Sequence, residues 1–128
     1  PNYCNYFQYK RGDEATVVCF NNSLPYGLEL YGVMQERNLR ASVFSINSHL
    51  HANYSRILDD VKKTKKLILI DDSKSRNRLS DRFLVDVLSV CTLKKRVIVS
   101  RSTTNNSFHP SQDGLDIDFN QIINDVTV

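Results

Sequence analysis

Residues 57–72 have the sequence ILDDVKKTKKLILIDD, and this stretch decides the fold class of the chain. Together with Tyr54, the residues Ile57, Leu58 and Val61 are spaced so that they line one face of a helix. The four apolar residues 67–70 follow a basic linker, and such a short apolar run is typical of a strand buried on both faces. The stretch therefore predicts a helix followed directly by a buried strand.

The same alternation of strand and helix extends along the chain on both sides of this stretch. Apolar runs predict strands at 15–20, 42–46 and 97–99, and a short strand at 6–10 precedes the turn signal at Gly12 and Asp13. Helical spacing predicts three further helices, whose apolar faces contain Leu24, Leu28, Tyr31 and Met34, then Leu79, Phe83, Leu84, Val87, Leu88 and Cys91, and finally Phe119, Ile122, Ile123 and Val126. Buried strands joined by helices predict an α/β fold, a parallel sheet with helices on both faces.

Composition fits one globular domain spanning residues 1–128. Hydrophobic residues make up 41% and charged residues 24% of the chain, and the net charge of +3 is far below that of a dedicated nucleic-acid binder. No apolar run is long enough for a membrane span, and the N-terminus lacks the pattern of a signal peptide. The three cysteines are far apart, which favours a reducing compartment, so we expect the protein in the cytoplasm.

Candidate ligand residues lie just after the predicted strands, where open α/β sheets bind their ligands. Asp71 and Asp72 follow the strand at 67–70, so two carboxylates there are candidates for holding Mg²⁺, although aspartates also commonly end a strand and cap the next turn. His109 lies in a long polar loop predicted at 102–111, and it is the best single candidate for ligand contact. His49 and His51 are expected to be loop residues.

Other features exclude or explain further classes of site. The chain has four glycines and no Gly-rich phosphate loop, which disfavours dinucleotide binding of the Rossmann type. Two basic clusters, 62–66 and 94–96, each precede a strand, and we interpret both as cations that complement the dipole at a helix C-terminus. Asp116 or Asp118 is placed to cap the last helix. The residues alone indicate no reaction centre.

Taken in order, the segments resemble the C-terminal domain of transketolase-like enzymes. The likeness is closest to the beta subunit of the first component of thiamin-dependent 2-oxoacid dehydrogenases. It begins with KRGDEATVV at residues 10–18 and continues with NLRASVF at 38–44. Its strongest part is residues 57–72, with VKKT at 61–64, and it ends with 97–101 and Phe108-His109-Pro110. The chain departs from the family pattern at Asn21-Asn22, at 50–53 and at 75–78, all in predicted loops.

The resemblance implies a three-layer α/β/α fold with a five-stranded mixed sheet whose first strand, near residues 6–10, is antiparallel to the rest. It also implies that thiamin diphosphate and Mg²⁺ are held by the pyrimidine-binding and pyrophosphate-binding domains of the parent enzyme. The C-terminal domain packs against those domains and supports a homodimer or heterotetramer. For a eukaryotic protein, the mitochondrial or plastid matrix is the alternative compartment.

The hypothesis that follows is an assembly domain without a complete active site of its own, with no catalytic, cofactor-binding or metal-binding residue transferred from the family. The alternative hypothesis is a freestanding small-ligand-binding or regulatory α/β domain. In that case Asp71, Asp72 and His109 are the expected ligand or interface residues.

Overall fold

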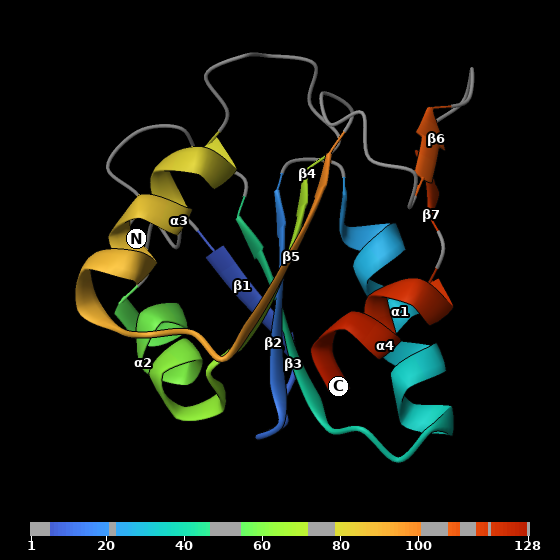
Figure 1. The fold of residues 1–128 in the computed structure, drawn as a ribbon, viewed down its shortest axis with the longest axis horizontal. Coiled ribbons are helices and arrows are strands. Elements are labelled where there is room, and N and C mark those ends of the chain that lie inside the picture. The colour runs from blue at the N-terminus through green and yellow to red at the C-terminus, as the bar shows by residue number, and fades with distance from the viewer. Residues whose placement is uncertain are drawn as a thin grey trace.

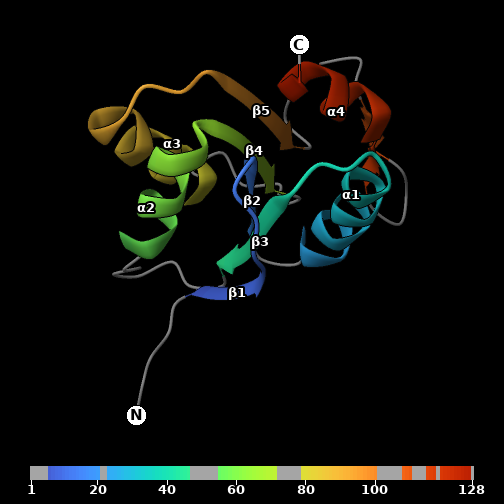
Figure 2. The ribbon, with the colours of Figure 1, turned by 90° about the horizontal axis from the view of Figure 1, so that it is seen from below.

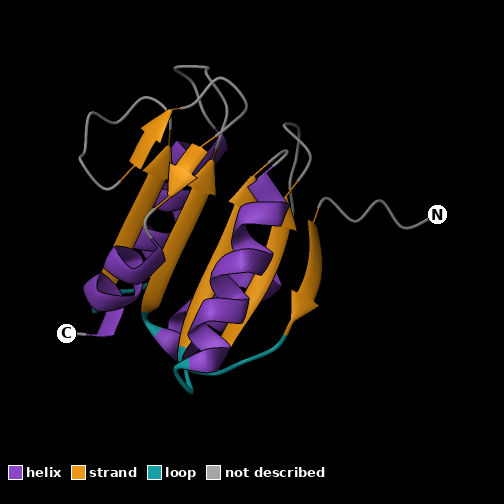
Figure 3. Ribbon diagram, turned by 90° about the vertical axis from the view of Figure 1, so that its right-hand side faces the viewer, coloured by secondary structure: helices purple, strands orange, loops and turns teal. Residues whose placement is uncertain are grey.

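The structure is a computed structural model that describes residues 6–20, 23–46, 55–71, 79–100, 108–110, 115–117 and 119–127. Five strands form the central sheet: β1 (Tyr6–Lys10), β2 (Ala15–Phe20), β3 (Ala41–Ile46), β4 (Lys66–Asp71) and β5 (Lys95–Ser100). Their order across the sheet is β1-β3-β2-β4-β5. β1 runs antiparallel to β3, and the other neighbouring strands are parallel, as Figure 3 shows. The predicted mixed α/β sheet is confirmed.

Four helices cover the two faces of this sheet, which gives the predicted three layers. They are α1 (Leu24–Glu36), α2 (Ser55–Thr64), α3 (Leu79–Val90) and α4 (Phe119–Thr127). α2 and α3 lie on one face, and α1 and α4 lie on the other (Figures 1 and 2). No helix in the described part of the chain is long and apolar enough to cross a membrane.

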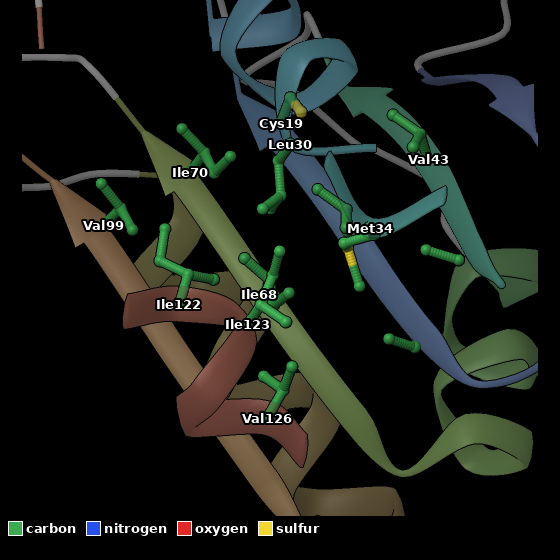
Figure 4. Close-up of a cluster of buried hydrophobic side chains, with 13 residues drawn as sticks. Cys19, Leu30, Met34, Val43, Ile68, Ile70, Val99, Ile122, Ile123 and Val126 are labelled. Atoms are coloured by element: carbon green, nitrogen blue, oxygen red, sulfur yellow. The ribbon is translucent and has the colours of Figure 1, made fainter. Parts of the chain in front are cut away.

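The core on the α1/α4 side is continuous and apolar. Leu30 and Met34 of α1 and Ile122 and Ile123 of α4 are fully or almost fully buried, and they belong to one cluster that includes Ile68 of β4 (Figure 4). The residues of α1 that are buried are Gly27, Leu30 and Met34. The predicted face was therefore partly wrong, because Leu24, Leu28 and Tyr31 are only partly buried beside it.

Gly27 sets how closely α1 approaches the sheet. A Cβ atom at this position would lie 2.1 Å from the Cys19 sulfur of β2. The helix then ends in a Schellman motif, in which the Asn38 amide donates to the Gln35 carbonyl and the Leu39 amide donates to the Met34 carbonyl. Asn38 has a φ of 60°, the left-handed conformation that this motif requires. The chain turns directly from α1 into β3.

The core on the α2/α3 side is built from the alternate residues of the same strands. Val18, Phe20, Leu67 and Leu69 face this side. Phe83 of α3 is fully buried, and its ring meets Phe20 edge-on, with centroids 5.8 Å apart. Because both faces of β2 and β4 are covered, those strands need continuous apolar sequence, which is the pattern that predicted them.

Two elements differ from the prediction. Strands β6 (Phe108–Pro110) and β7 (Leu115–Ile117) form a separate antiparallel pair, where a polar loop was expected at 102–111. Runs of three residues are too short to show a periodic pattern in sequence. The interpretation of residues 94–96 as the end of a helix was also wrong, since α3 ends at Val90 and Lys95 begins β5. Lys62 and Lys63 do lie in the last turn of α2.

Candidate functional site

Asp71 ends β4 near the middle of the sheet. Its neighbours in register are Phe20 of β2 and Ser100 of β5, and the residue is fully buried. Asp71 is thus the last residue of its strand, as one interpretation of the acidic pair expected, while a cap on the next turn falls outside the described residues. Asp72 lies outside the described residues, as do Asn21, Asn22 and both His49 and His51.

His109 lies on a different element, in the β6/β7 pair, where its register partner is Asp116. Only its backbone is described, so its role as a ligand or interface residue stays a prediction. The proposed capping role of Asp116 or Asp118 also lies outside the described side chains. Among the described residues, no group of three or more His, Cys, Asp or Glu side chains is placed to hold a metal ion.

A polar network lies at the opposite end of the sheet, where the parallel strands begin. Asp60 of α2 accepts a hydrogen bond from the Thr16 hydroxyl of β2 at 2.6 Å and another from the Ser42 hydroxyl of β3 at 3.2 Å. Thr64, one turn after Asp60 on the helix, lies 2.8 Å from the Thr16 hydroxyl. The Asp60 carboxylate therefore ties α2 to two parallel strands.

Gly12 completes this network from the turn before β2. Its amide donates to the Ser42 Oγ at 3.0 Å, and its carbonyl lies 2.8 Å from the same oxygen, within reach of the hydroxyl proton. Since a serine hydroxyl has one proton, it donates either to Gly12 or to Asp60 at any moment. A Cβ atom on Gly12 would lie 2.5 Å from the Ala41 backbone nitrogen, so only glycine fits this approach.

We call Gly12, Thr16, Ser42, Asp60 and Thr64 the amino-end network. The sequence motifs contained all five residues, but only Gly12 was given a role, as a turn signal, and no hydrogen-bond network was predicted. The signal was present, because Thr16 and Ser42 are hydroxyl residues within strands that are buried along their whole length and mostly apolar. Buried hydroxyls need hydrogen-bond partners, and here the partners come from a helix and a turn. The geometry orients chain segments and offers no activated nucleophile.

A cluster of ion pairs lies on the surface at the same end of the sheet. Arg40 Nε lies 2.9 Å from an Asp13 carboxylate oxygen and 3.3 Å from a Glu14 oxygen, and the Glu14 amide donates to the Arg40 carbonyl. These side chains are all substantially exposed, so solvent weakens their attraction and the pairs contribute little stability.

Cys19 is the one buried thiol whose acidity is clearly altered among the described residues. Burial raises the pKa of the Cys19 thiol from 9.0 to about 12, and a hydrogen bond with the Gly27 backbone opposes that rise. A buried thiol that stays protonated is a poor nucleophile, because the thiolate is the reactive form. Cys19 is therefore a core residue, as its position in an apolar strand predicted.

α3 presents apolar side chains to solvent as well as to the core. Val85 is 66% exposed, Val90 is 47% and Leu88 is 46%, while Phe83 and Val87 of the same helix are buried. Single exposed apolar residues are ordinary on protein surfaces, but Val85 and Leu88 are three positions apart and so share one helix face, which another protein surface can cover.

The fold was compared with known proteins. No family model matches the sequence, and no curated protein matches it. Among solved structures, the chain is similar to a split-gene transketolase, described as an inactive beta4 tetramer, with a TM-score of 0.66 and 16% sequence identity. The similarity covers 77% of this chain and 32% of that one, so the chain matches about a third of its neighbour's length. The chain has a transketolase-like α/β fold.

Proposed function

We propose that this chain is the C-terminal assembly domain of a thiamin-diphosphate-dependent enzyme, and that the enzyme is of the 2-oxoacid dehydrogenase beta-subunit kind. The domain contributes contact surface and stability to the parent enzyme, and the chemistry takes place in other domains. The observation that carries the proposal is the extent of the fold similarity, which spans most of this chain and about a third of a transketolase chain.

The amino-end network supports the finer assignment. The three stretches on which the sequence resemblance depends are 10–18, 38–44 and 57–72, and each contributes to this network through Gly12 and Thr16, Ser42, and Asp60 and Thr64 respectively. Residues separated by more than 40 positions in sequence thus meet in one set of hydrogen bonds. Motifs that converge in this way favour a shared architecture over a chance likeness of separate segments.

The sequence resemblance brings no cofactor-binding residue into this chain. Thiamin diphosphate binds through a Mg²⁺ ion that takes oxygen ligands, and among the described residues no group of three or more His, Cys, Asp or Glu side chains is placed to hold a metal ion. We therefore propose that the pyrimidine-binding and pyrophosphate-binding domains of the parent enzyme hold it. A cytoplasmic location, or the mitochondrial or plastid matrix, is part of the same proposal.

The exposed face of α3 supports an assembly role. Val85 and Leu88 lie on one exposed face of α3, and burial of this face against a second subunit would release water from apolar surface. The structural neighbour is described as a tetramer of one kind of chain that is inactive. By analogy we propose that this chain also associates with copies of itself, as a homodimer or within a heterotetramer.

Isothermal titration calorimetry tests the absence of a cofactor site. Titration of the full chain with thiamin diphosphate and Mg²⁺ is expected to give only the heat of dilution, and a complete thiamin-dependent enzyme serves as the positive control. Binding in the micromolar range, accompanied by a rise in the melting temperature, would overturn the proposed division of labour.

A further inference from the structure

Two basic segments far apart in the sequence meet at the beginning of β4 and β5. The amides of Lys94 and Lys95 both donate to the Lys65 carbonyl, at 2.7 and 3.3 Å, and Lys66 is the register partner of Lys95. We call Lys65, Lys66, Lys94, Lys95 and Arg96 the basic patch. Lys94, Lys95 and Arg96 lie outside α3, so the dipole of that helix does not account for the positive charge at these positions.

The charge of this patch is not compensated within the described chain. Neither 61–67 nor 91–97 contains an acidic residue, and none of the five cations forms an ion pair with a described carboxylate. The parallel register also places Lys66 beside Lys95, so like charges repel across the two strands where they begin.

A hollow adjoins the basic patch on the α3 side of the sheet. It has a volume of about 360 Å³ and is lined by Leu88 and residues 91–96. The register places Arg96 beside Leu67, which faces the α2/α3 core, so Arg96 lies on the same side of the sheet as α3. Leu88 and Leu93 give the hollow an apolar part, and Lys94 and Arg96 give it a basic rim, while Lys95 lines it as the strand residue between them, on the alternate face.

The hollow also lies next to a free sheet edge. Among the described strands, β5 pairs with β4 alone and forms one end of the five-stranded order (Figure 2). An edge strand presents backbone N–H and C=O groups that can pair with an added extended chain. Apolar contact, positive charge and backbone pairing are thus available side by side.

We propose that this surface binds an extended acidic segment of a partner protein, with a large apolar side chain of that segment seated in the hollow. The carboxylates of the segment would meet the basic patch, and its backbone would run along β5. A nucleic acid is disfavoured because neither the basic patch nor the lining of the hollow contains an aromatic residue on which a base can stack. This surface shares only Leu88 with the α3 face proposed for assembly, so the Lys94→Glu/Arg96→Glu pair tests the peptide site apart from the assembly role.

The binding experiment uses a fluorescent peptide that alternates aspartate and leucine, with fluorescence anisotropy as the readout. Three probes are compared with it: the same peptide with asparagine in place of aspartate, polyglutamate, and single-stranded DNA of equal charge. The peptide is expected to bind at least about tenfold more tightly than each of the three, because only it satisfies both the charged and the apolar part of the surface. Its binding should weaken as salt is raised.

Variants of the full chain locate the site. Lys94→Glu combined with Arg96→Glu should raise the Kd for the peptide about tenfold or more, because reversing rim charges turns attraction into repulsion. Leu88→Ser should raise it about threefold to tenfold through lost apolar contact. Arg82→Glu is the matched control, an exposed cation at the other end of α3 that should change the Kd less than about twofold. Circular dichroism verifies that each variant is folded.

Three results would overturn the proposal. The first is no binding of the aspartate–leucine peptide at low salt. The second is equal binding of polyglutamate or DNA, which would show that the surface recognises charge alone. The third is equal weakening by Arg82→Glu and by the Lys94→Glu/Arg96→Glu pair, which would place the contact elsewhere on the chain.

Discussion

The two faces of the sheet are closed in different ways. On the α1/α4 face, Gly27 lets α1 lie directly on Cys19, and the layer between helix and sheet is apolar throughout. On the α2/α3 face, the helix is held partly by hydrogen bonds, because Asp60 of α2 binds hydroxyls of β2 and β3.

The outer surfaces of the two faces differ as well. α3 is apolar on the side that faces the core and also carries exposed Val85, Leu88 and Val90. The difference teaches that the α1/α4 face is built for internal packing, while the α2/α3 face combines packing with exposed apolar side chains on α3. The predictions below test this contrast, from the largest expected effect to the smallest.

Phe83→Ala separates the two sides of α3. Phe83 is fully buried against Phe20, so its truncation should lower the free energy of unfolding by about 4 kcal/mol. Val85→Ala, two positions along the same helix but exposed, should change it by less than about 0.5 kcal/mol. Urea denaturation measures both values. Similar losses for the two variants would mean that α3 does not pack as described.

Gly27→Ala tests the tight contact on the α1/α4 face. The added methyl group would clash with the Cys19 sulfur, and we expect a loss of about 2 kcal/mol, largely relieved in a Cys19→Ala background. The matched control is Gly32→Ala in the same helix, where a Cβ atom meets nothing within 4 Å. That variant should gain about 0.5–1 kcal/mol from higher helix propensity. Thermal or urea unfolding of a double-mutant cycle decides the matter.

Thr16→Val tests the hydrogen bonds on the opposite face. The substitution keeps the shape of the side chain but removes the hydroxyl shared by Asp60 and Thr64. We expect a loss of about 1–2 kcal/mol in the free energy of unfolding. Thr92→Val, at an exposed position, should be close to neutral. If Thr16→Val and Thr92→Val change the free energy of unfolding equally little, the network does not stabilise the packing of α2.

The Cys19 thiol predicts a pH effect from the α1/α4 core. Its pKa is about 12 in the folded chain and near 9.0 when exposed, so the unfolded chain binds fewer protons between these values. Stability supplied by this group is complete below pH 9 and is lost as the pH rises toward 12, on the order of 1 kcal/mol per pH unit. The slope of unfolding free energy against pH should be shallower in Cys19→Ala. Equal slopes would contradict the buried, protonated thiol.

The sequence predicted the fold because burial on both faces leaves a strong mark. The run 67–70 and the strand at 15–20 are apolar at every position or nearly so, and β4 and β2 are indeed inner strands of the sheet, together with β3. It placed the face of α1 less well, since a glycine gives no apolar signal although Gly27 faces the core. The β6 and β7 strands are too short to give a recognisable pattern in the sequence.

The site was harder to predict than the fold. In sequence, Asp60 resembles the other acidic residues that are expected to be exposed. Its hydrogen bonds with Thr16 and Ser42 become visible only when β2, β3 and α2 meet at the same end of the sheet. The sequence did not predict the basic patch as one surface, and it wrongly placed residues 94–96 at the end of a helix. Residues 65–66 and 94–96 are far apart in sequence and become neighbours only through the pairing of β4 with β5. The functional prediction for Asp71, Asp72 and His109 is still open to test.

Sedimentation equilibrium of the full chain tests the assembly role most directly, with Val85→Asp as the variant and Arg82→Glu as the control. We predict that the wild-type chain and the control associate reversibly, with a mass that rises with concentration to at least twice that of the 14.7 kDa chain, while Val85→Asp remains a folded monomer. A wild-type chain that stays at the monomer mass at every concentration would contradict the account.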